Sequence, residues 1–293
     1  MMSQNISVDI LLPTYNGESY LKEQIESILN QSYNNLRLII RDDGSKDRTI
    51  EIINDFLKKD SRVIYLENKE GNLGLVKSIE KMMMFSDAEI IFFSDQDDVW
   101  IENKIDIFLQ KYKNQDIPVL IHSNCNVTDE ALNVRGLFFS DAPKKQGLQN
   151  SFFNYFVQGA SAMINKKLKE SLLPFSEEVY IHDRYFHLMA EILGKRIYID
   201  EPTMLYRQHG KNLIGSQTIF EKIKNNLNLK RFYINQDKVL FYKLAVKFPD
   251  NKILKLYKDL TSDKVSRFKK INLISKNNIN LRWKEKILLL IKN

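Results

Sequence analysis

Three carboxylates stand within four positions, at Asp95, Asp97 and Asp98, directly after the apolar run 90–93. Carboxylates this close repel one another unless a cation joins them. A hard divalent cation such as Mg²⁺ or Mn²⁺ takes one or two protein carboxylates and completes its octahedron with water and phosphate oxygens. The alternative is an acidic N-cap, supplied by Asp98, for a helix that begins near residue 101. The cluster therefore predicts a metal site, and a helix N-cap supplied by Asp98 is the simpler alternative.

A second acidic pair, Asp42 and Asp43, follows the apolar run 36–40. An acidic residue after the second strand of a nucleotide-binding α/β unit can accept hydrogen bonds from a ribose or a base. The alternative is an ordinary Asp-Gly turn that also caps the next helix. The first loop, 13–17, has neither the G-x-G-x-x-G nor the G-x-x-x-x-G-K-[ST] pattern. A dinucleotide site and a P-loop are therefore excluded, and nucleotide binding must use another scheme.

The two acidic clusters, at 42–43 and 95–98, can form one site only if the fold brings their loops together. Apolar runs at 8–12, 36–40, 63–66 and 90–93 alternate with helically periodic segments at 18–31, 47–58 and 75–85. Such alternation is typical of a parallel sheet covered by helices on both faces. Ligands of these sheets bind at the carboxyl ends of the strands, where the polar residues fall. The first half is therefore expected to be a doubly wound α/β unit.

Beyond residue 100 the pattern is mixed. The expected helices are 101–113, 151–157 and 183–193, the expected strands are 119–122, 159–164 and 196–199, and a long loop runs through 141–149. From about residue 217 onward the sequence is nearly all helical in period. We find no internal repeat.

Six motifs follow one another between residues 8 and 210. They are LLPTYN at 11–16, ILNQSY at 28–33, RDDGSKD at 41–47, GNLG at 71–74, SDQDDVW at 94–100 and YRQH at 206–209. In this order and spacing they resemble family 2 glycosyltransferases with a GT-A fold. The last two also resemble bacterial rhamnosyltransferase-like enzymes of surface-polysaccharide assembly. The resemblance implies an α/β fold, a doubly wound mixed sheet in a GT-A domain at 1–215, with a mainly helical C-terminal extension at 216–293.

The resemblance also implies a site for a nucleotide-sugar donor. Pro13, Tyr15 and Asp43, with Asp42 beside it, would hold the base. Asn72 and Lys77 would lie near the ribose or the phosphates. Uracil and thymine offer Asp43 the same hydrogen-bonding edge, so both nucleotides stay open. The full donor set is Pro13, Tyr15, Asn16, Asp42, Asp43, Asn72, Lys77, Asp95 and Gln96.

The metal implied by the resemblance is Mn²⁺ or Mg²⁺. Asp95 and Asp97 match the family's D-x-D element, with Asp97 as the direct ligand, and His209 would approach the metal or the diphosphate. A metal that joins two phosphate oxygens stabilises the nucleoside diphosphate as it leaves. Taken alone, His209 is more simply read as an ordinary loop histidine.

On the acceptor side, the family uses an Asp in an acidic pair at the start of a helix as the general base. The matching segment reads YIHDRY, so Asp183 is the candidate base, and attack from the opposite face would invert the anomeric carbon. The usual Glu-Asp pair is His182-Asp183 here, which leaves the role of His182 open. An N-cap is the alternative for Asp183, and both roles can coexist. Gln158 and Gly159 resemble the acceptor-side loop, where glycine permits close backbone approach.

Composition and charge limit the compartment and the partners. The single cysteine, Cys125, can form no internal disulfide, and we see neither a signal peptide nor the ~18–20 apolar residues of a membrane span, so we expect a cytoplasmic protein. Residues 216–293 hold 19 Lys and Arg against 6 Asp and Glu, whereas 1–215 hold 25 against 31. The stretch 281–292 mixes Trp, Leu and Ile with Lys, as interfacial helices do.

This basic segment fits two partners equally. One is the anionic inner face of the cell membrane, where a lipid-linked acceptor would lie, and the other is a partner subunit. Nucleic acid is disfavoured because no recognised binding module is present. The sequence leaves the oligomeric state open.

The leading prediction is an inverting, metal-dependent glycosyltransferase of cell-surface polysaccharide or glycoconjugate assembly, with dTDP-rhamnose or a UDP-hexose as donor and a glycan acceptor. The alternatives are a transferase of the same fold that acts on protein glycans, and a non-catalytic glycan-binding scaffold. A nucleotidyltransferase is disfavoured because it would show a Gly-rich basic loop after the first strand, which 13–16 is not.

Overall fold

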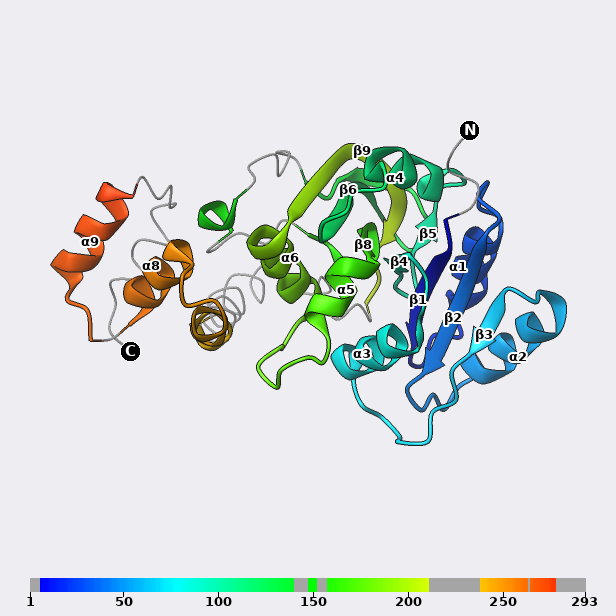
Figure 1. Ribbon diagram of the computed structural model, residues 1–293. Coiled ribbons are helices and arrows are strands. Elements are labelled where there is room, and N and C mark those ends of the chain that lie inside the picture. Colours follow the sequence, from blue (N-terminus) through cyan, green and yellow to red (C-terminus); the bar gives the residue numbers. More distant parts are fainter. Residues whose placement is uncertain (1–5, 140–146, 152–156, 211–237, 263, 278–293) are drawn as a thin grey trace. The chain divides into compact units, whose positions relative to one another are not determined.

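The structure is a computed structural model that describes residues 6–139, 147–151, 157–210, 238–262 and 264–277 (Figure 1). The chain divides into two compact units. The first comprises Met1–Lys144, Val157–Phe175 and Ile181–Ser216, and the second comprises Lys145–Phe156, Ser176–Tyr180 and Gln217–Asn293. The domain boundary between 215 and 216 stays a prediction, and each unit is described by itself.

The first unit is built on one mixed sheet. Among the described residues it has nine strands in the order β3-β2-β1-β4-β8-β6-β9-β5, with β7 paired to β6. β1 to β4 are mutually parallel, whereas β8 runs antiparallel to β4 and β6. The strands are β1 Val8–Thr14, β2 Leu36–Asp42, β3 Val63–Tyr65, β4 Ile90–Phe93, β5 Val99–Trp100, β6 Val119–Thr128, β7 Val134–Leu137, β8 Ala162–Asn165 and β9 Lys195–Arg207.

Neighbouring phenylalanines of β4 show that both faces of the sheet are covered. Phe92 packs on Trp100 and Phe108, with ring centroids 5.7 and 5.2 Å away, whereas Phe93 packs on Phe186 at 5.1 Å. Successive side chains of a strand point to opposite faces, so both faces carry buried aromatic contacts. The prediction of a doubly wound mixed sheet is confirmed. The helices are α1 Leu21–Leu29, α2 Thr49–Lys59, α3 Leu75–Phe85, α4 Lys104–Tyr112, α5 Lys166–Leu172 and α6 His182–Leu193.

The helices join the core through apolar stripes. In α1, Leu21, Ile25 and Ile28 are fully buried at spacings of four and three residues, and they share one hydrophobic cluster with Ile10 and Leu12 of β1. A fully buried Leu or Ile contributes about 1.5–3 kcal/mol of transfer free energy. This packing fixes the strand ends from which the polar loops leave.

Several predicted elements have different bounds in the structure, and two of them show the physical reason. The strand expected at 159–164 begins only at Ala162, because Gly159–Ser161 form the 3₁₀ helix η2. β9 continues through Pro202, which was expected to follow the strand. The register between β6 and β9 shifts at Ser123 and Asn124, where Pro202 pairs, so the missing proline N–H is accommodated at an irregularity.

Several further differences concern short elements. β5, β7 and α5 were not predicted, and β7 occupies part of a region without an expected element. Most of the helix expected at 151–157 lies outside the described residues.

In the second unit the described residues form mainly helices. They are a segment at 238–247, α8 Lys252–Thr261 and α9 Arg267–Lys276, with a 3₁₀ helix η1 at Leu148–Asn150. The rings of Phe241 and Tyr257 stack with centroids 3.8 Å apart. None of the described helices is long and apolar enough to cross a membrane. Residues 211–237 and the stretch 281–292 lie outside the described residues.

Candidate functional site

Side-chain hydrogen bonds tie together the loops that follow β1, β2 and β4. Gln96 Oε1 accepts from the N–H of Tyr15 at 2.9 Å, and Gln96 Nε2 donates to the Tyr15 carbonyl at 3.0 Å. Gly17 lies against the same amide, since a Cβ there would be 2.4 Å from Gln96 Oε1. Asn16, at a φ of 49°, accepts from the N–H of Lys46 at 2.9 Å. The structure therefore brings the predicted donor residues Tyr15, Asn16 and Gln96 together.

Asp42 builds the turn after β2. Its Oδ1 accepts from the N–H groups of Gly44 and Ser45 at 3.0 and 2.7 Å. Its Oδ2 accepts from the hydroxyl of Thr14 at 2.9 Å and from the hydroxyl of Ser45. A carboxylate offers about four lone-pair sites, so these four bonds fill it. Asp42 therefore shapes the loop in which its neighbour lies.

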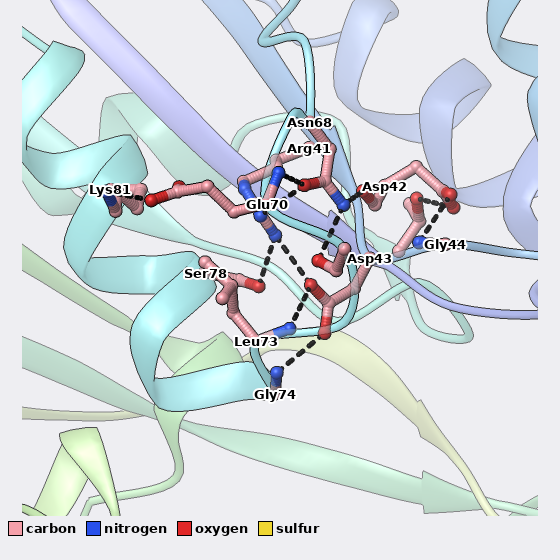
Figure 2. Close-up of polar contacts among 12 residues, drawn as sticks. Arg41, Asp42, Asp43, Gly44, Asn68, Glu70, Leu73, Gly74, Ser78 and Lys81 are labelled. Atoms are coloured by element: carbon pink, nitrogen blue, oxygen red, sulfur yellow. Dashed lines mark hydrogen bonds and ion pairs between the residues drawn. The ribbon is translucent and has the colours of Figure 1, made fainter.

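Arg41 is a buried cation at the centre of this loop (Figure 2). One guanidinium nitrogen donates to Asp43 Oδ1 and to Ser78 Oγ, both at 2.7 Å, and another donates to Asn68 Oδ1 at 2.9 Å. Arg41 is 2% exposed and Asp43 5%. Charges this deep are stable only when paired and hydrogen-bonded, so Arg41 fixes the position of Asp43. Pro13 lies beside Arg41 in the register of β1 and β2.

Asp43 also holds the loop that contains Asn72 (Figure 2). Its Oδ1 accepts from the N–H of Leu73 at 2.9 Å, and its Oδ2 from the N–H of Gly74 at 2.7 Å. Burial acts to raise the pKa of Asp43, but these N–H groups and Arg41 lower it overall. Asp43 is therefore a rigid, ionised acceptor with the exposed Asn72 next to it.

Lys77 lies in the first turn of α3, next to Ser78. Its Nζ is 2.7 Å from Glu80 Oε2, and its side chain is half exposed. Glu80 is itself buried, and its Oε1 accepts from the N–H of Phe175 at 2.6 Å. Glu80 therefore anchors Lys77 on α3. The same helix carries Ser78, whose hydroxyl accepts a hydrogen bond from Arg41.

The acidic loop after β4 is desolvated. Burial, followed by the charges of Asp97 and Asp183, raises the pKa of Asp95 to about 7. Burial, followed by the charges of Asp95 and Asp97, raises the pKa of Asp98 well above its usual range. Asp98 Oδ1 accepts from the N–H of Arg207 at 3.2 Å, whereas its Oδ2 has no partner. Because α4 begins only at Lys104, Asp98 does not cap that helix, and the capping alternative is wrong.

His209 meets the acidic loop from the end of β9. Its Nε2 lies 2.9 Å from Asp97 Oδ2, and its ring stacks on Tyr20 with centroids 4.7 Å apart. Arg207 donates to the Asp97 carbonyl at 2.9 Å and to the Glu130 carbonyl at 2.6 Å, and the Tyr20 hydroxyl donates to Glu130. His209 is thus held against Asp97 by residues that we did not predict, and it is not an ordinary loop histidine.

The donor atoms here fit a hard divalent cation. In the part of the chain that the structure describes, no three His, Cys, Asp or Glu side chains form a ready-made cage. Two atoms that could bind such a cation, Asp97 Oδ2 and His209 Nε2, lie 2.9 Å apart, and the buried Oδ2 of Asp98 lacks a partner. Magnesium and manganese sites that rely on substrate phosphates need only one or two protein ligands.

Asp183 lies in the first turn of α6. Burial raises its pKa to about 6, although the N–H groups of Arg184 and Gly159 and the charge of Arg184 act to lower it. Its Oδ1 has no hydrogen-bond partner. The N-cap position is Ile181, so the capping alternative for Asp183 is wrong. The ring of its neighbour His182 lies 6.0 Å from that of Phe93, the last residue of β4, so Asp183 lies close to the acidic loop.

His182 lies beside Asp183 against the 3₁₀ turn η2. A Cβ on Gly159 would be 2.9 Å from His182 Nε2, so the expected close approach at Gly159 is made by this imidazole. Burial lowers the pKa of His182 to about 4, which keeps the ring neutral. Gln158 caps η2, and its Oε1 accepts from the N–H of Ser161 at 2.6 Å. Gly159 therefore lies against α6, and Gln158 is the residue that precedes it at the start of η2.

Sequence reasoning missed the residues that hold the site. Of these, Arg41 had a usable signal, because a charged residue at the end of an apolar strand needs a buried partner. The missed residues are Tyr20, Arg41, Asn68, Ser78, Glu130 and Arg207.

The sequence matches known transferases over most of its length. The family model described as Glycosyl transferase family 2 matches residues 9–172. The chain is 30% identical over 242 residues to the dTDP-rhamnosyl transferase RfbG of Shigella flexneri, which covers 75% of this chain and 79% of that protein.

Two solved structures share the fold. TarS 1–349 of S. aureus in complex with UDP-GlcNAc has a TM-score of 0.59 at 16% identity, over 97% of this chain and 84% of that chain. The mannosyltransferase PcManGT from Pyrobaculum calidifontis, in complex with GDP-Man and Mn²⁺, has a TM-score of 0.59 at 14% identity, over 97% and 78%. These matches confirm the predicted GT-A fold.

Proposed function

The chain belongs to glycosyl transferase family 2 and is a glycosyltransferase, and we propose that it is an inverting, metal-dependent enzyme that moves a sugar from a nucleotide-diphosphate donor to a hydroxyl of a glycan acceptor. One observation carries this proposal. Asp95 is desolvated by burial, which raises its pKa, and the charges of both Asp97 and Asp183 raise that pKa further. Asp97, which with His209 is suited to bind the donor diphosphate through a metal, therefore lies near Asp95. The candidate general base Asp183 lies near the same carboxylate.

The donor base is recognised by Asp43. This carboxylate is ionised and rigid, and one of its lone-pair sites is left after the bonds from Arg41, Leu73 and Gly74. It can accept the ring N–H of uracil or thymine, while Asn72 and Lys77 approach the ribose or phosphates. We propose dTDP-rhamnose or a UDP-hexose as donor, and the similarity to a dTDP-rhamnosyl transferase supports the first.

Asp97 and His209 would hold Mn²⁺ or Mg²⁺. When bound, the metal neutralises the charge that develops on the leaving nucleoside diphosphate. Asp95 lies beside this pair. Burial raises its pKa most, and the negative charges of Asp97 and Asp183, which a cation would offset, raise it further. The Mn²⁺ in the mannosyltransferase complex supports this choice of metal.

Asp183 acts as the general base. A pKa of about 6 leaves it ionised at neutral pH and basic enough to take the proton of an acceptor hydroxyl. The hydroxyl oxygen attacks the anomeric carbon as the bond to the nucleoside diphosphate breaks, and displacement from the opposite face inverts the configuration. Its unpartnered Oδ1 is available for this contact.

The acceptor is a cell-surface glycan or glycoconjugate, probed best in lipid-linked form. In the second unit, α9 combines the exposed Arg267 and Lys269 with Phe268, which is 87% exposed. Basic and exposed apolar side chains on one helix support contact of 216–293 with the inner face of the cell membrane. A partner subunit for this segment, a protein-glycan acceptor and a non-catalytic scaffold are the competing outcomes.

The proposal is tested by thermal-shift and calorimetric titration of the full chain with UDP, dTDP, GDP and CMP, with and without Mn²⁺. A ligand that binds only the folded state raises its apparent stability. We expect metal-dependent stabilisation by UDP or dTDP, followed by release of that nucleotide when the matching sugar donor and acceptor are supplied. No response to any nucleotide would favour the scaffold.

A further inference from the structure

Two buried polar atoms without a hydrogen-bond partner lie on adjacent residues at the start of α6. They are His182 Nδ1 and Asp183 Oδ1. His182 is only 6% exposed. Buried polar atoms are nearly always paired, and an unpaired one costs about 1–3 kcal/mol. Two such atoms on adjacent residues mark a place where a ligand completes the hydrogen bonding.

Both side chains lie against the same glycine. A Cβ on Gly159 would be 2.9 Å from His182 Nε2 and 3.6 Å from Asp183 Cβ. The imidazole also packs against Phe93 and Phe186, with ring centroids 6.0 and 5.5 Å away. These contacts hold the ring in one orientation, so its nitrogens have fixed directions.

The chemistry of the pair differs from that of two carboxylates. Burial keeps His182 neutral, and a neutral imidazole has one N–H donor and one acceptor nitrogen. An ionised Asp183 only accepts. The pair can therefore bind two hydroxyls at once, with different roles for each.

We propose that His182 is a specificity-determining residue that hydrogen-bonds the acceptor hydroxyl next to the one that Asp183 deprotonates. The ligand is an uncharged sugar unit with two vicinal hydroxyls. This inference rests on the proposed function, because it places the acceptor of that reaction at Asp183. The contact selects among acceptors and leaves the donor site unchanged.

The test uses the full chain saturated with Mn²⁺ and with UDP or dTDP, whichever stabilises it. Binding of methyl α-L-rhamnoside, methyl β-D-glucoside, methyl β-D-galactoside and methyl N-acetyl-β-D-glucosaminide is measured by saturation-transfer NMR. The variants are His182→Ala and His182→Gln. His187→Gln is the matched control, since His187 is buried on the same helix but faces Glu191.

We expect His182→Ala to weaken binding of the preferred glycoside about tenfold. His182→Gln should recover at least half of the lost signal, because an amide keeps a donor and an acceptor. Deoxy analogues of the glycosides test the contact directly. Removing the hydroxyl that contacts His182 should weaken binding to the wild type. The same removal should cause no further loss in His182→Ala, which already lacks the contact. Both His182 variants should be stabilised by the nucleotide as much as the wild type is. The His187→Gln control should bind the glycosides like the wild type.

The outcomes separate the two proposals. Equal glycoside binding by wild type and His182→Ala, or an undiminished deoxy effect in that variant, overturns the role of His182. The same holds if no glycoside binds a wild-type protein that binds nucleotide. Absence of nucleotide binding in the wild type overturns the proposed function instead.

Discussion

His209 Nε2 lies 2.9 Å from Asp97 Oδ2, although 112 positions separate the two residues in the chain. Stacking on Tyr20 holds the imidazole in place. We expect Asp97→Asn and His209→Ala each to abolish the Mn²⁺-dependent part of nucleotide stabilisation, because each removes one of the two proposed protein ligands of the metal. Titration of Mn²⁺ against nucleotide-loaded protein measures the loss. Asp55→Asn, at an exposed position of α2, is the control and should titrate like wild type.

The buried ion pair of Arg41 and Asp43 should make a large contribution to the free energy of unfolding, because it holds the loops that follow β2 and β3. Arg41→Met leaves Asp43 buried without its cation, which costs about 3–5 kcal/mol in the free energy of unfolding. Arg48→Met removes an exposed pair with Glu51 and should cost at most about 0.5 kcal/mol. Urea unfolding measures both. Equal effects would show that the Arg41 pair is not a structural anchor.

The same pair has a defined pH dependence. The folded-state pKa of Asp43 lies below its ordinary value of 3.8, so its contribution to stability is present above about pH 4 and is lost as the pH falls through the folded pKa. The difference in unfolding free energy between wild type and Arg41→Met should therefore narrow at pH 3.

The ionised form of Asp183 should be needed for activity, whereas burying its charge should lower the stability of the fold. Its folded-state pKa of about 6 predicts that kcat/KM rises with pH to a plateau above about pH 7. Asp183→Asn should lower kcat at least about 100-fold. Because the folded pKa is above the ordinary 3.8, the burial cost is absent below about pH 4 and complete above about pH 6.

Asp183→Asn should therefore stabilise the fold by about 1–3 kcal/mol at pH 8 and by nothing at pH 4. Thermal unfolding at the two pH values measures the difference. Asp116→Asn, at an exposed carboxylate, should show neither effect. A gain that is equal at both pH values would contradict the assigned pKa.

The fold was predictable wherever local pattern and tertiary packing agree. α3 and β4 have the predicted bounds, because a helical stripe ends at Phe85 and a polar loop follows Phe93. β5 has only two residues, and β7 is exposed along its whole length, so neither has a hydrophobic period. α5 did have a signal that we missed: Asn165 Oδ1 accepts from the N–H of Leu168, as an N-cap does.

The site was predictable only in part, for a related reason. Asp95 and Asp97 stand at a strand end, where the topology of a parallel sheet places ligands. Tyr20 and Arg207 act through contacts with Glu130 and His209, over long separations that leave no local pattern. Their roles appear only once β9 lies beside β6.

Gly17 and Gln96 should be energetically coupled. A Cβ at position 17 would lie 2.4 Å from Gln96 Oε1 and would displace the amide from the Tyr15 backbone. We expect Gly17→Ala to cost about 0.5–1.5 kcal/mol in the wild type, because the displaced amide loses its bonds to Tyr15, and clearly less in a Gln96→Ala background. A double-mutant cycle by urea unfolding gives the coupling energy. Additive effects would mean that the close approach carries no constraint.

Lys104 is a buried ammonium whose removal should not destabilise the fold at neutral pH. It is 0% exposed, donates to the Ala160 carbonyl at 2.8 Å and lies 3.8 Å from the centroid of the Trp100 ring. Burial lowers its pKa to about 7, against the opposing effects of Cys125 and of the acidic loop. Replacing a buried charge with an apolar side chain of similar length is often neutral or stabilising by about 1–4 kcal/mol.

The sign of the pH effect follows from that lowered pKa. Between about pH 7 and 10.5 the unfolded lysine keeps its proton while the folded one has lost it, so wild-type stability gains from rising pH in this range. Lys104→Met should therefore be at least as stable as wild type at pH 7, and its advantage should shrink by pH 9. Lys169→Met, which removes a comparable bond to the Ser86 carbonyl, is the control. We expect it to lose about 1 kcal/mol. Urea unfolding at pH 7 and pH 9 measures both variants, and an advantage of Lys104→Met that grows with pH would contradict the burial of a charged lysine.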